Sequence, residues 1–241
     1  MKFFRKNIIL CMLSMQFFFI ALTMYEKLQS QTYYFKPCIA DVLVFLSWKI
    51  YLAIIISPYV ILITHMLMDA DDNYNYIIRY KSRCRVFFKN IKDSVIFAFI
   101  FTAYCLLSII LWSKFFGFDN IVWNKYDSYF FVATHTTTNI SFNAFIIKYG
   151  VVFLLIICII SFISVICAWV GNKILAILLC VVVFIVDFYM KDNSLMNYIL
   201  FNYKEVDVSI QSNILYGVIL LIIGILIGCI IAIRKEFYGN H

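Results

Sequence analysis

Charged side chains are scarce in this sequence of 241 residues. Asp, Glu, Lys and Arg make up 14% of it, whereas 64% of the residues are hydrophobic. A soluble domain has roughly 25% charged and about 45–50% apolar residues, so this chain has too few charges to cover the surface of a water-soluble globule. The composition excludes a soluble enzyme, a disordered chain and a cytosolic nucleic-acid binder, and it indicates an integral membrane protein.

Proline and glycine are also rare, with two and seven residues respectively. Both interrupt helices, so their scarcity favours long, unbroken helical segments. The alternation of apolar and polar residues that a membrane β-barrel needs is missing, because runs such as residues 151–157 are apolar on every face. Backbone groups in lipid must pair within their own segment, so we expect an all-α polytopic membrane protein.

Motifs for catalysis and cofactor binding are missing as well. No Gly-Lys dipeptide occurs, which excludes a phosphate-binding loop, and the chain cannot bind ATP in that way itself. His65, His135 and His241 are isolated, so the sequence contains no H-E-x-x-H zinc site. We therefore predict no catalytic residue, no metal site and no cofactor of the chain's own.

Six apolar stretches are long enough to cross a bilayer, which takes about 20 residues. A single transmembrane domain over residues 1–241 is expected. The stretches run roughly over residues 7–24, 41–68, 94–116, 145–170, 174–190 and 214–233.

The distribution of Lys and Arg predicts the orientation of these six helices. With the N-terminus inside, twelve basic residues lie on the inner side and seven on the outer side. Cytoplasmic loops carry the excess of Lys and Arg, so both termini are expected in the cytoplasm. The net charge of +7 follows from this asymmetry and does not require a nucleic-acid partner.

The inner segment 69–93 has the pattern of a basic amphipathic helix between the second and third spans. Its apolar residues recur at spacings of three and four and occupy one face. One interpretation is an interfacial helix that contacts anionic lipid. The other is a docking helix for a cytosolic partner. The basic residues that cover its remaining surface are Arg79, Lys81, Arg83, Arg85 and Lys89.

Two charged residues within spans are functional candidates, because charge in a bilayer is costly. Lys49 lies inside the second span, whose outer end carries Asp41, and Asp187 lies near the outer end of the fifth span. Either Lys49 extends towards the outer interface, or Lys49 and Asp187 pair across helices. Small residues on the last span suit close helix packing, between subunits or within one. They are Gly217, Gly224 and Gly228.

Three longer segments are expected on the outer side, over residues 25–40, 117–144 and 191–213. The second is rich in aromatic and hydroxyl side chains, among them Trp123 and Tyr126. Tryptophan and tyrosine are ordinary anchors at the membrane interface. Contact with a peptide is the alternative role.

This plan of six spans, inner termini and one basic inner helix after the second span resembles the permease subunits of the second type of ABC exporter. It is similar above all to small permeases of Gram-positive bacteriocin self-immunity and antimicrobial-peptide resistance systems. Residues 78–83, Ile-Arg-Tyr-Lys-Ser-Arg, look like the I-R-x-x-S-R segment of that family.

The resemblance implies a half-transporter in a bacterial cell membrane. A second permease chain, identical or related, would complete the path, and two separate ABC ATPase subunits would bind ATP. The basic inner helix would couple the permease to the ATPase, and an amphipathic peptide or another hydrophobic compound would move outward. The runner-up is a non-transporting immunity or sensor protein that binds a peptide at its outer loops. A substrate-binding subunit of a vitamin importer ranks lower, because the first span is bulky at Phe17, Phe18 and Phe19.

Overall fold

The computed structural model describes residues 6–68, 83–170, 173–190, 199, 203 and 211–234, and these ranges contain helices and no β-strand. Scarce Pro and Gly allow the long helices, as the composition predicts. In chain order the elements are α1 (Lys6–Tyr33), α2 (Ile39–Leu46), α3 (Lys49–Tyr51), the π-helical turn η2 (Leu52–Ile56), α4 (Ser57–Met68), α6 (Arg83–Phe115), α7 (Tyr129–Thr134), α8 (Phe142–Val170), α9 (Lys173–Tyr189) and α10 (Gln211–Arg234).

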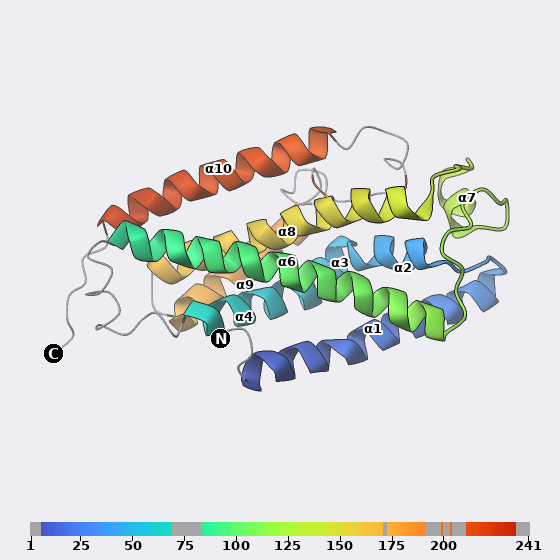
Figure 1. Cartoon of the computed structure of the whole chain (residues 1–241), viewed down its shortest axis with the longest axis horizontal. Coiled ribbons are helices and arrows are strands. Elements are labelled where there is room, and N and C mark those ends of the chain that lie inside the picture. Colours follow the sequence, from blue (N-terminus) through green and yellow to red (C-terminus); the bar gives the residue numbers. More distant parts are fainter. Residues whose placement is uncertain are drawn as a thin grey trace.

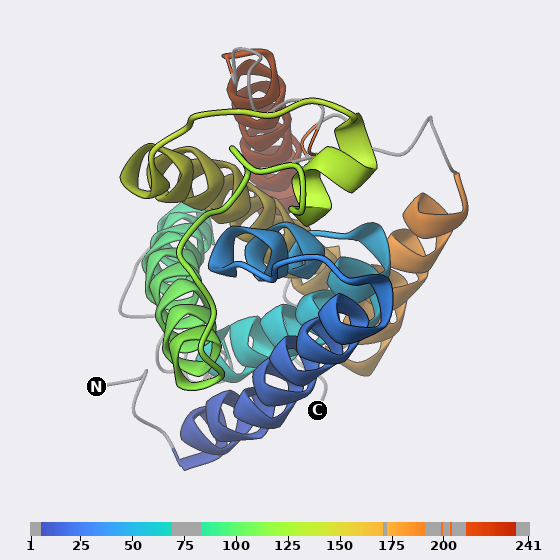
Figure 2. The same cartoon turned by 90° about the vertical axis from the view of Figure 1, so that its right-hand side faces the viewer.

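The long helices lie side by side and run back and forth between two ends of an elongated bundle (Figure 1). We call the end where α1 begins and α10 finishes the terminal end. The opposite end, which carries residues 34–38 and the segment 116–141 with α7, is the loop end. Figure 2 looks along the bundle from the loop end and shows α2 enclosed by the other helices.

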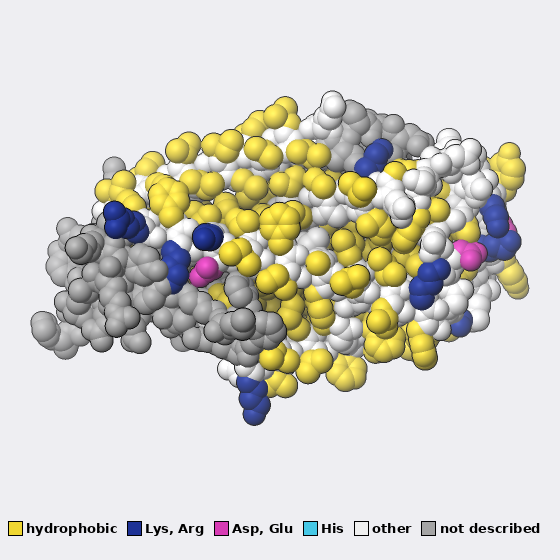
Figure 3. Space-filling model, viewed as in Figure 1, with side chains coloured by type: hydrophobic (Ala, Val, Ile, Leu, Met, Phe, Trp, Pro, Cys, Tyr) yellow, Lys and Arg dark blue, Asp and Glu magenta, His cyan; other side chains and the backbone are white. Residues whose placement is uncertain are grey.

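Five helices in the described ranges are long and apolar enough to cross a membrane: α1, the α3–α4 segment, α6, α8 and α10. Helix α9 is equally apolar but has only 17 residues. A broad apolar belt covers the middle of the molecule in Figure 3, and the described charged side chains on this face gather towards its two ends. These features confirm an all-α protein of the membrane class.

Two predicted spans have different bounds in the structure. Helix α1 continues to Tyr33, so much of the expected outer segment 25–40 is helical. The expected helix 41–68 is broken after α2, where Ser47 donates both its backbone N–H and its hydroxyl to the Val44 carbonyl oxygen. The π-helical turn then precedes Pro58, a residue that has no N–H to donate to the preceding turn.

The basic segment also differs from its prediction as a separate surface helix. From Arg83 onward it belongs to α6, a continuous helix of 33 residues with no Gly or Pro. Its apolar face explains the continuity, because Val86 and Phe87 are buried against Trp169 of α8 and Ala232 of α10. Arg79 and Lys81 lie outside the described residues.

Helix α8 occupies the centre of the bundle and contacts α4, α6, α9 and α10. Its rings Phe145, Tyr149 and Phe153 are fully buried and stack on one another along one face. All eight residues of α2 are buried next to this region. The core is therefore fully enclosed around α2, and polar side chains placed there are kept from solvent.

Candidate functional site

The most unusual chemistry in the described residues lies at the loop end, where two acidic side chains are buried. We call the set Glu26, Cys38, Asp41, Trp123 and Tyr203 the loop-end cluster. These residues come from distant parts of the chain: α1, the start of α2, the segment 116–141 and the segment before α10. Buried acidic groups must be paired, hydrogen-bonded or neutralised, so each one requires an account of its partners.

Asp41 is fully buried in the first turn of α2 and accepts three hydrogen bonds. The Trp123 Nε1–H donates to Oδ1 at 2.9 Å, and the Tyr203 hydroxyl donates to the same oxygen at 3.1 Å. The Cys38 thiol donates to Oδ2 at 3.0 Å. A helix N-terminus also favours negative charge. Asp41 is therefore well provided with donors despite its burial.

Backbone hydrogen bonds hold the segment 116–141 over Asp41. The Ile39 N–H donates to the Asp119 carbonyl oxygen at 2.9 Å, and the Lys36 N–H donates to that of Asp127 at 2.8 Å. The Trp123 ring stacks on Phe130, with ring centroids 4.8 Å apart. Because both the backbone and the ring are fixed, the indole N–H has one direction and points at Asp41.

The groups around this site have shifted titration behaviour with identifiable causes. Burial raises the pKa of the Cys38 thiol, and the nearby Asp41 raises it further, so Cys38 remains a thiol and can donate. At the surface, the Lys36 ammonium lies 2.9 Å from the Asp127 carboxylate. That hydrogen bond lowers the pKa of Asp127 and raises the pKa of Lys36.

Glu26 is the contrasting member of the cluster. Its side chain is 1% exposed, and neither carboxyl oxygen has a hydrogen-bond partner among the described residues. Asp41 lies close enough to act on it electrostatically. The neighbouring Lys27 is directed elsewhere, because its Nζ donates to the Phe116 carbonyl oxygen at 3.3 Å and lies over the Phe116 ring. An ionised, unpaired carboxylate in this position would cost several kcal/mol.

Sequence reasoning found only part of this cluster. It placed Asp41 at the outer end of the second span and left Glu26 within the outer segment 25–40, without a role. The available signal was the acidic residue within a helical pattern that continues to Tyr33. The convergence of Trp123 and Tyr203 on Asp41 depends on loop folding, which has no local pattern in the sequence.

The predicted pair of Lys49 and Asp187 stays a prediction. Lys49 is half-buried at the start of α3, and Asp187 is half-buried near the end of α9. The turn η2, which follows α3 directly, contacts α9. The helix that carries Asp187 therefore contacts the turn that follows Lys49 in the chain.

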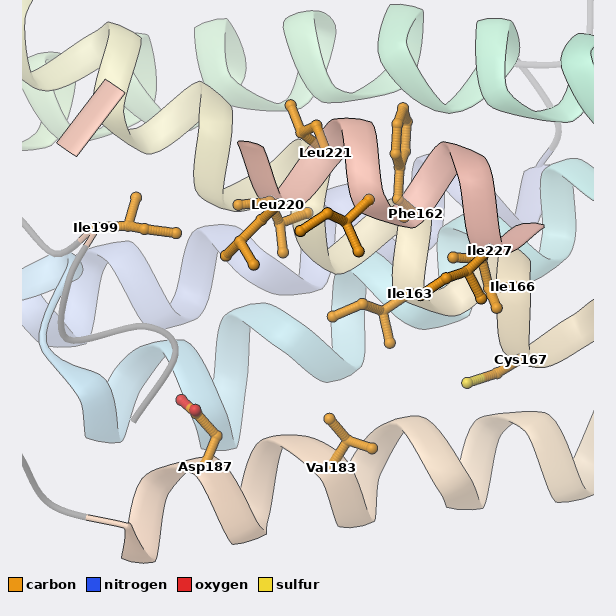
Figure 4. Close-up of a pocket in the computed structure, with 13 residues that line it drawn as sticks. Phe162, Ile163, Ile166, Cys167, Val183, Asp187, Ile199, Leu220, Leu221 and Ile227 are labelled. Atoms are coloured by element: carbon orange, nitrogen blue, oxygen red, sulfur yellow. The ribbon is translucent and has the colours of Figure 1, made fainter. Parts of the chain in front are cut away.

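Asp187 also lines a cavity of about 230 Å³ between α8, α9 and α10. Figure 4 shows its carboxylate at one end of a lining that is otherwise apolar, with Phe162 and Ile163 from α8 and Leu220 and Ile227 from α10. A cavity of this chemistry suits an alkyl chain or another apolar group.

The three glycines of α10 lie next to side chains of α8 and α6 in the same chain. A Cβ atom built on Gly217 would lie 3.3 Å from Leu155 of α8, and one on Gly224 would lie 3.8 Å from Ile166. A Cβ atom on Gly228 would lie only 2.1 Å from the Phe87 ring of α6. Gly228 is thus the position where the absence of a side chain allows close helix contact.

The predicted coupling residues divide between described and undescribed parts. Arg85 is exposed and Lys89 is half-buried on the first turns of α6, beside the buried Phe87. Arg83 begins that helix. Arg85 and Lys89 thus lie at the terminal end on a helix that is fixed to the bundle through its apolar face.

Across the ranges that the structure describes, no three His, Cys, Asp or Glu side chains are grouped so as to hold a metal ion. Comparisons with protein-family models, with characterised proteins and with solved structures found no match for this chain.

Proposed function

We propose that this chain is the membrane-spanning permease subunit of an ABC exporter that moves an amphipathic peptide or another hydrophobic compound outward. The observation that carries the proposal is the start of α6, where Arg85 is exposed while Phe87 is buried against α8 and α10. A force applied to this basic surface is transmitted along a continuous helix of about 50 Å.

The proposal includes six membrane crossings with both termini in the cytoplasm of a bacterial cell. Helix α9 supplies the sixth crossing, and its length of about 25 Å is short for a bilayer. Among the described basic residues, more lie at the terminal end than at the loop end, so the terminal end faces the cytoplasm. At the terminal end they are Lys6, Arg83, Arg85, Lys89, Lys92, Lys173 and Arg234, and at the loop end Lys27, Lys36, Lys114, Lys125 and Lys148.

The proposed mechanism requires partners for its energy. Two ATPase subunits bind ATP and contact the basic surface that includes Arg79, Lys81, Arg83, Arg85 and Lys89. A second permease chain, identical or related, forms the other wall of the path. Acidic side chains on the ATPase would complement the basic surface and fix its orientation. The apolar cavity between α8, α9 and α10 supports a hydrophobic substrate or lipid contact.

Co-purification of the full chain with an ATPase from native membranes tests this function. We expect the wild-type chain to recover an ABC ATPase and to stimulate its ATP hydrolysis. Changing Arg79, Arg83 and Arg85 to Glu is expected to abolish both, because opposite charges at the contact become like charges.

A matched charge reversal at the loop end controls for general effects of introducing acidic side chains. Lys125 is exposed on the segment 116–141, and Lys125→Glu is expected to leave ATPase recovery unchanged. Equal recovery by the wild type and the triple variant would remove the coupling role. Failure to recover any ATPase from native membranes would remove the transporter assignment.

The second candidate is a non-transporting immunity or sensor protein, and one feature of the loop end favours it. Tyr34 is 90% exposed and Tyr126 is 77% exposed, on segments that hydrogen bonds hold in place. Rigid exposed tyrosines are common in peptide-binding surfaces. This function predicts peptide binding that is unchanged by the triple arginine variant and needs no ATPase.

A further inference from the structure

The loop-end cluster supports an inference that does not depend on the proposed transport function. We propose that Glu26 and Asp41 together bind a small monovalent cation, either a proton or an alkali-metal ion, inside the loop end of the bundle.

The two carboxyl groups receive unequal numbers of hydrogen-bond donors. Trp123, Tyr203 and Cys38 all donate to Asp41. Glu26 has two buried oxygens and receives no described donor. Asp41 can therefore remain an anion, whereas Glu26 requires a positive charge from outside the chain to offset its burial.

The charged group that acts on Glu26 is Asp41, which is acidic, and no described side chain donates a hydrogen bond to either Glu26 oxygen. The Nζ of Lys27 on α1 donates to the Phe116 carbonyl oxygen and lies over the Phe116 ring. The groups within electrostatic reach of Glu26 are instead acidic or phenolic, and they come from several elements. They are Asp41 of α2, Tyr51 of α3, Tyr129 of α7 and Tyr203.

The donor set also defines the chemistry of the ion. Carboxylate and phenol oxygens are hard ligands, which suit a proton or an alkali ion and do not suit a soft transition metal. Cys38 is occupied as a donor to Asp41 and is not a candidate ligand. Glu26 is 1% exposed and Asp41 is fully buried, which leaves no opening through which an organic ammonium group could reach them.

Glu26→Gln is the decisive variant, because it keeps the shape of the side chain and removes its charge. Asp119→Asn removes an acidic charge from an exposed position at the same end and is the matched control. The full chain, purified in detergent, is heated in two series. In the first series NaCl replaces choline chloride stepwise at pH 8 and constant ionic strength. In the second series the pH is lowered from 8 to 5 in choline chloride.

Binding to the folded state alone raises its stability by mass action. We expect a tenfold rise in the free concentration of the ion that binds to raise the unfolding midpoint of the wild type and of Asp119→Asn by about 3–5 °C. Glu26→Gln is expected to lose this dependence. A response to NaCl assigns an alkali ion, and a response to pH alone assigns a proton.

A midpoint that responds to neither series in the wild type, or that responds equally in Glu26→Gln, overturns the proposal. If Glu26→Gln does not fold, labelling of the wild type with dicyclohexylcarbodiimide replaces it. This reagent modifies protonated carboxyls in apolar surroundings. Modification of Glu26 that NaCl or high pH suppresses supports the site, whereas modification that neither condition changes, or no modification, contradicts it.

Discussion

The two ends of the bundle differ in whether their charged side chains are buried or exposed. At the loop end Glu26 and Asp41 are buried, whereas at the terminal end Arg85 is exposed and only its apolar neighbours enter the core. Side-chain length explains the difference. Arginine and lysine can place their charge in water while their stems cover apolar surface. The short side chains of Glu and Asp cannot, so they require donors or a bound ion.

The largest effect is expected when the buried hydrogen-bond acceptor of Asp41 is removed at the loop end. Asp41→Ala leaves the Trp123 and Tyr203 donors buried without an acceptor, at a cost of about 3 kcal/mol or more. Thermal unfolding of the purified chain measures the loss. Asp41→Asn keeps an oxygen acceptor for both donors and is expected to lose much less. Equal losses in the two variants would mean that the hydrogen bonds contribute little.

A smaller loss is expected from packing at the terminal end. Gly228→Ala forces the Phe87 ring to move, because the new Cβ atom would overlap it, and this costs about 1–3 kcal/mol. Gly224→Ala adds the same atom at ordinary contact distance from Ile166 and is the control.

Thermal unfolding and thiol cross-linking check this packing independently. Cys84 of α6 and Cys229 of α10 are free and close enough to interact electrostatically. A short bismaleimide is expected to join them in the wild type and in Gly224→Ala, and more slowly in Gly228→Ala. The same rate in all three chains would place the contact between α6 and α10 elsewhere.

The exposed charges of the terminal end are expected to matter little for stability. Arg85→Glu should change the free energy of unfolding by less than about 0.5 kcal/mol, because the side chain is exposed. A larger loss, measured by thermal unfolding of the isolated chain, would mean that Arg85 supports the fold. A loss of ATPase stimulation in a variant of normal stability would place its role in coupling.

The smallest effect is expected at the surface of the loop end. The pKa of Asp127 is lowered by Lys36, so this ion pair stabilises the fold above the ordinary aspartate pKa of 3.8 and is lost as the pH falls through the lowered value. The unfolding midpoints of wild type and Asp127→Asn should therefore differ slightly at pH 6 and converge near pH 3. High salt should remove the difference. A difference that persists at pH 3 would have another cause.

The pattern of apolar residues located the helices better than it located their buried faces. Predicted and observed bounds agree closely for α8 and α10, which are continuous and lack Pro. The prediction was wrong for residues 83–93, which continue into α6, and for the break after α2. Both depend on packing, because Phe87 is fixed by Trp169 and Ala232, and α2 is enclosed by its neighbours.

The sequence alone determined that the protein is helical and belongs to a membrane. Too few charges, few helix breakers and long apolar runs leave no other way to satisfy the backbone in lipid. Only the tertiary structure decided which polar groups meet. Membrane helices such as α8 are apolar on nearly every side, so periodicity does not identify the face that is buried. Glu26, Asp41, Trp123 and Tyr203 therefore come together through helix packing and loop hydrogen bonds that no local pattern encodes.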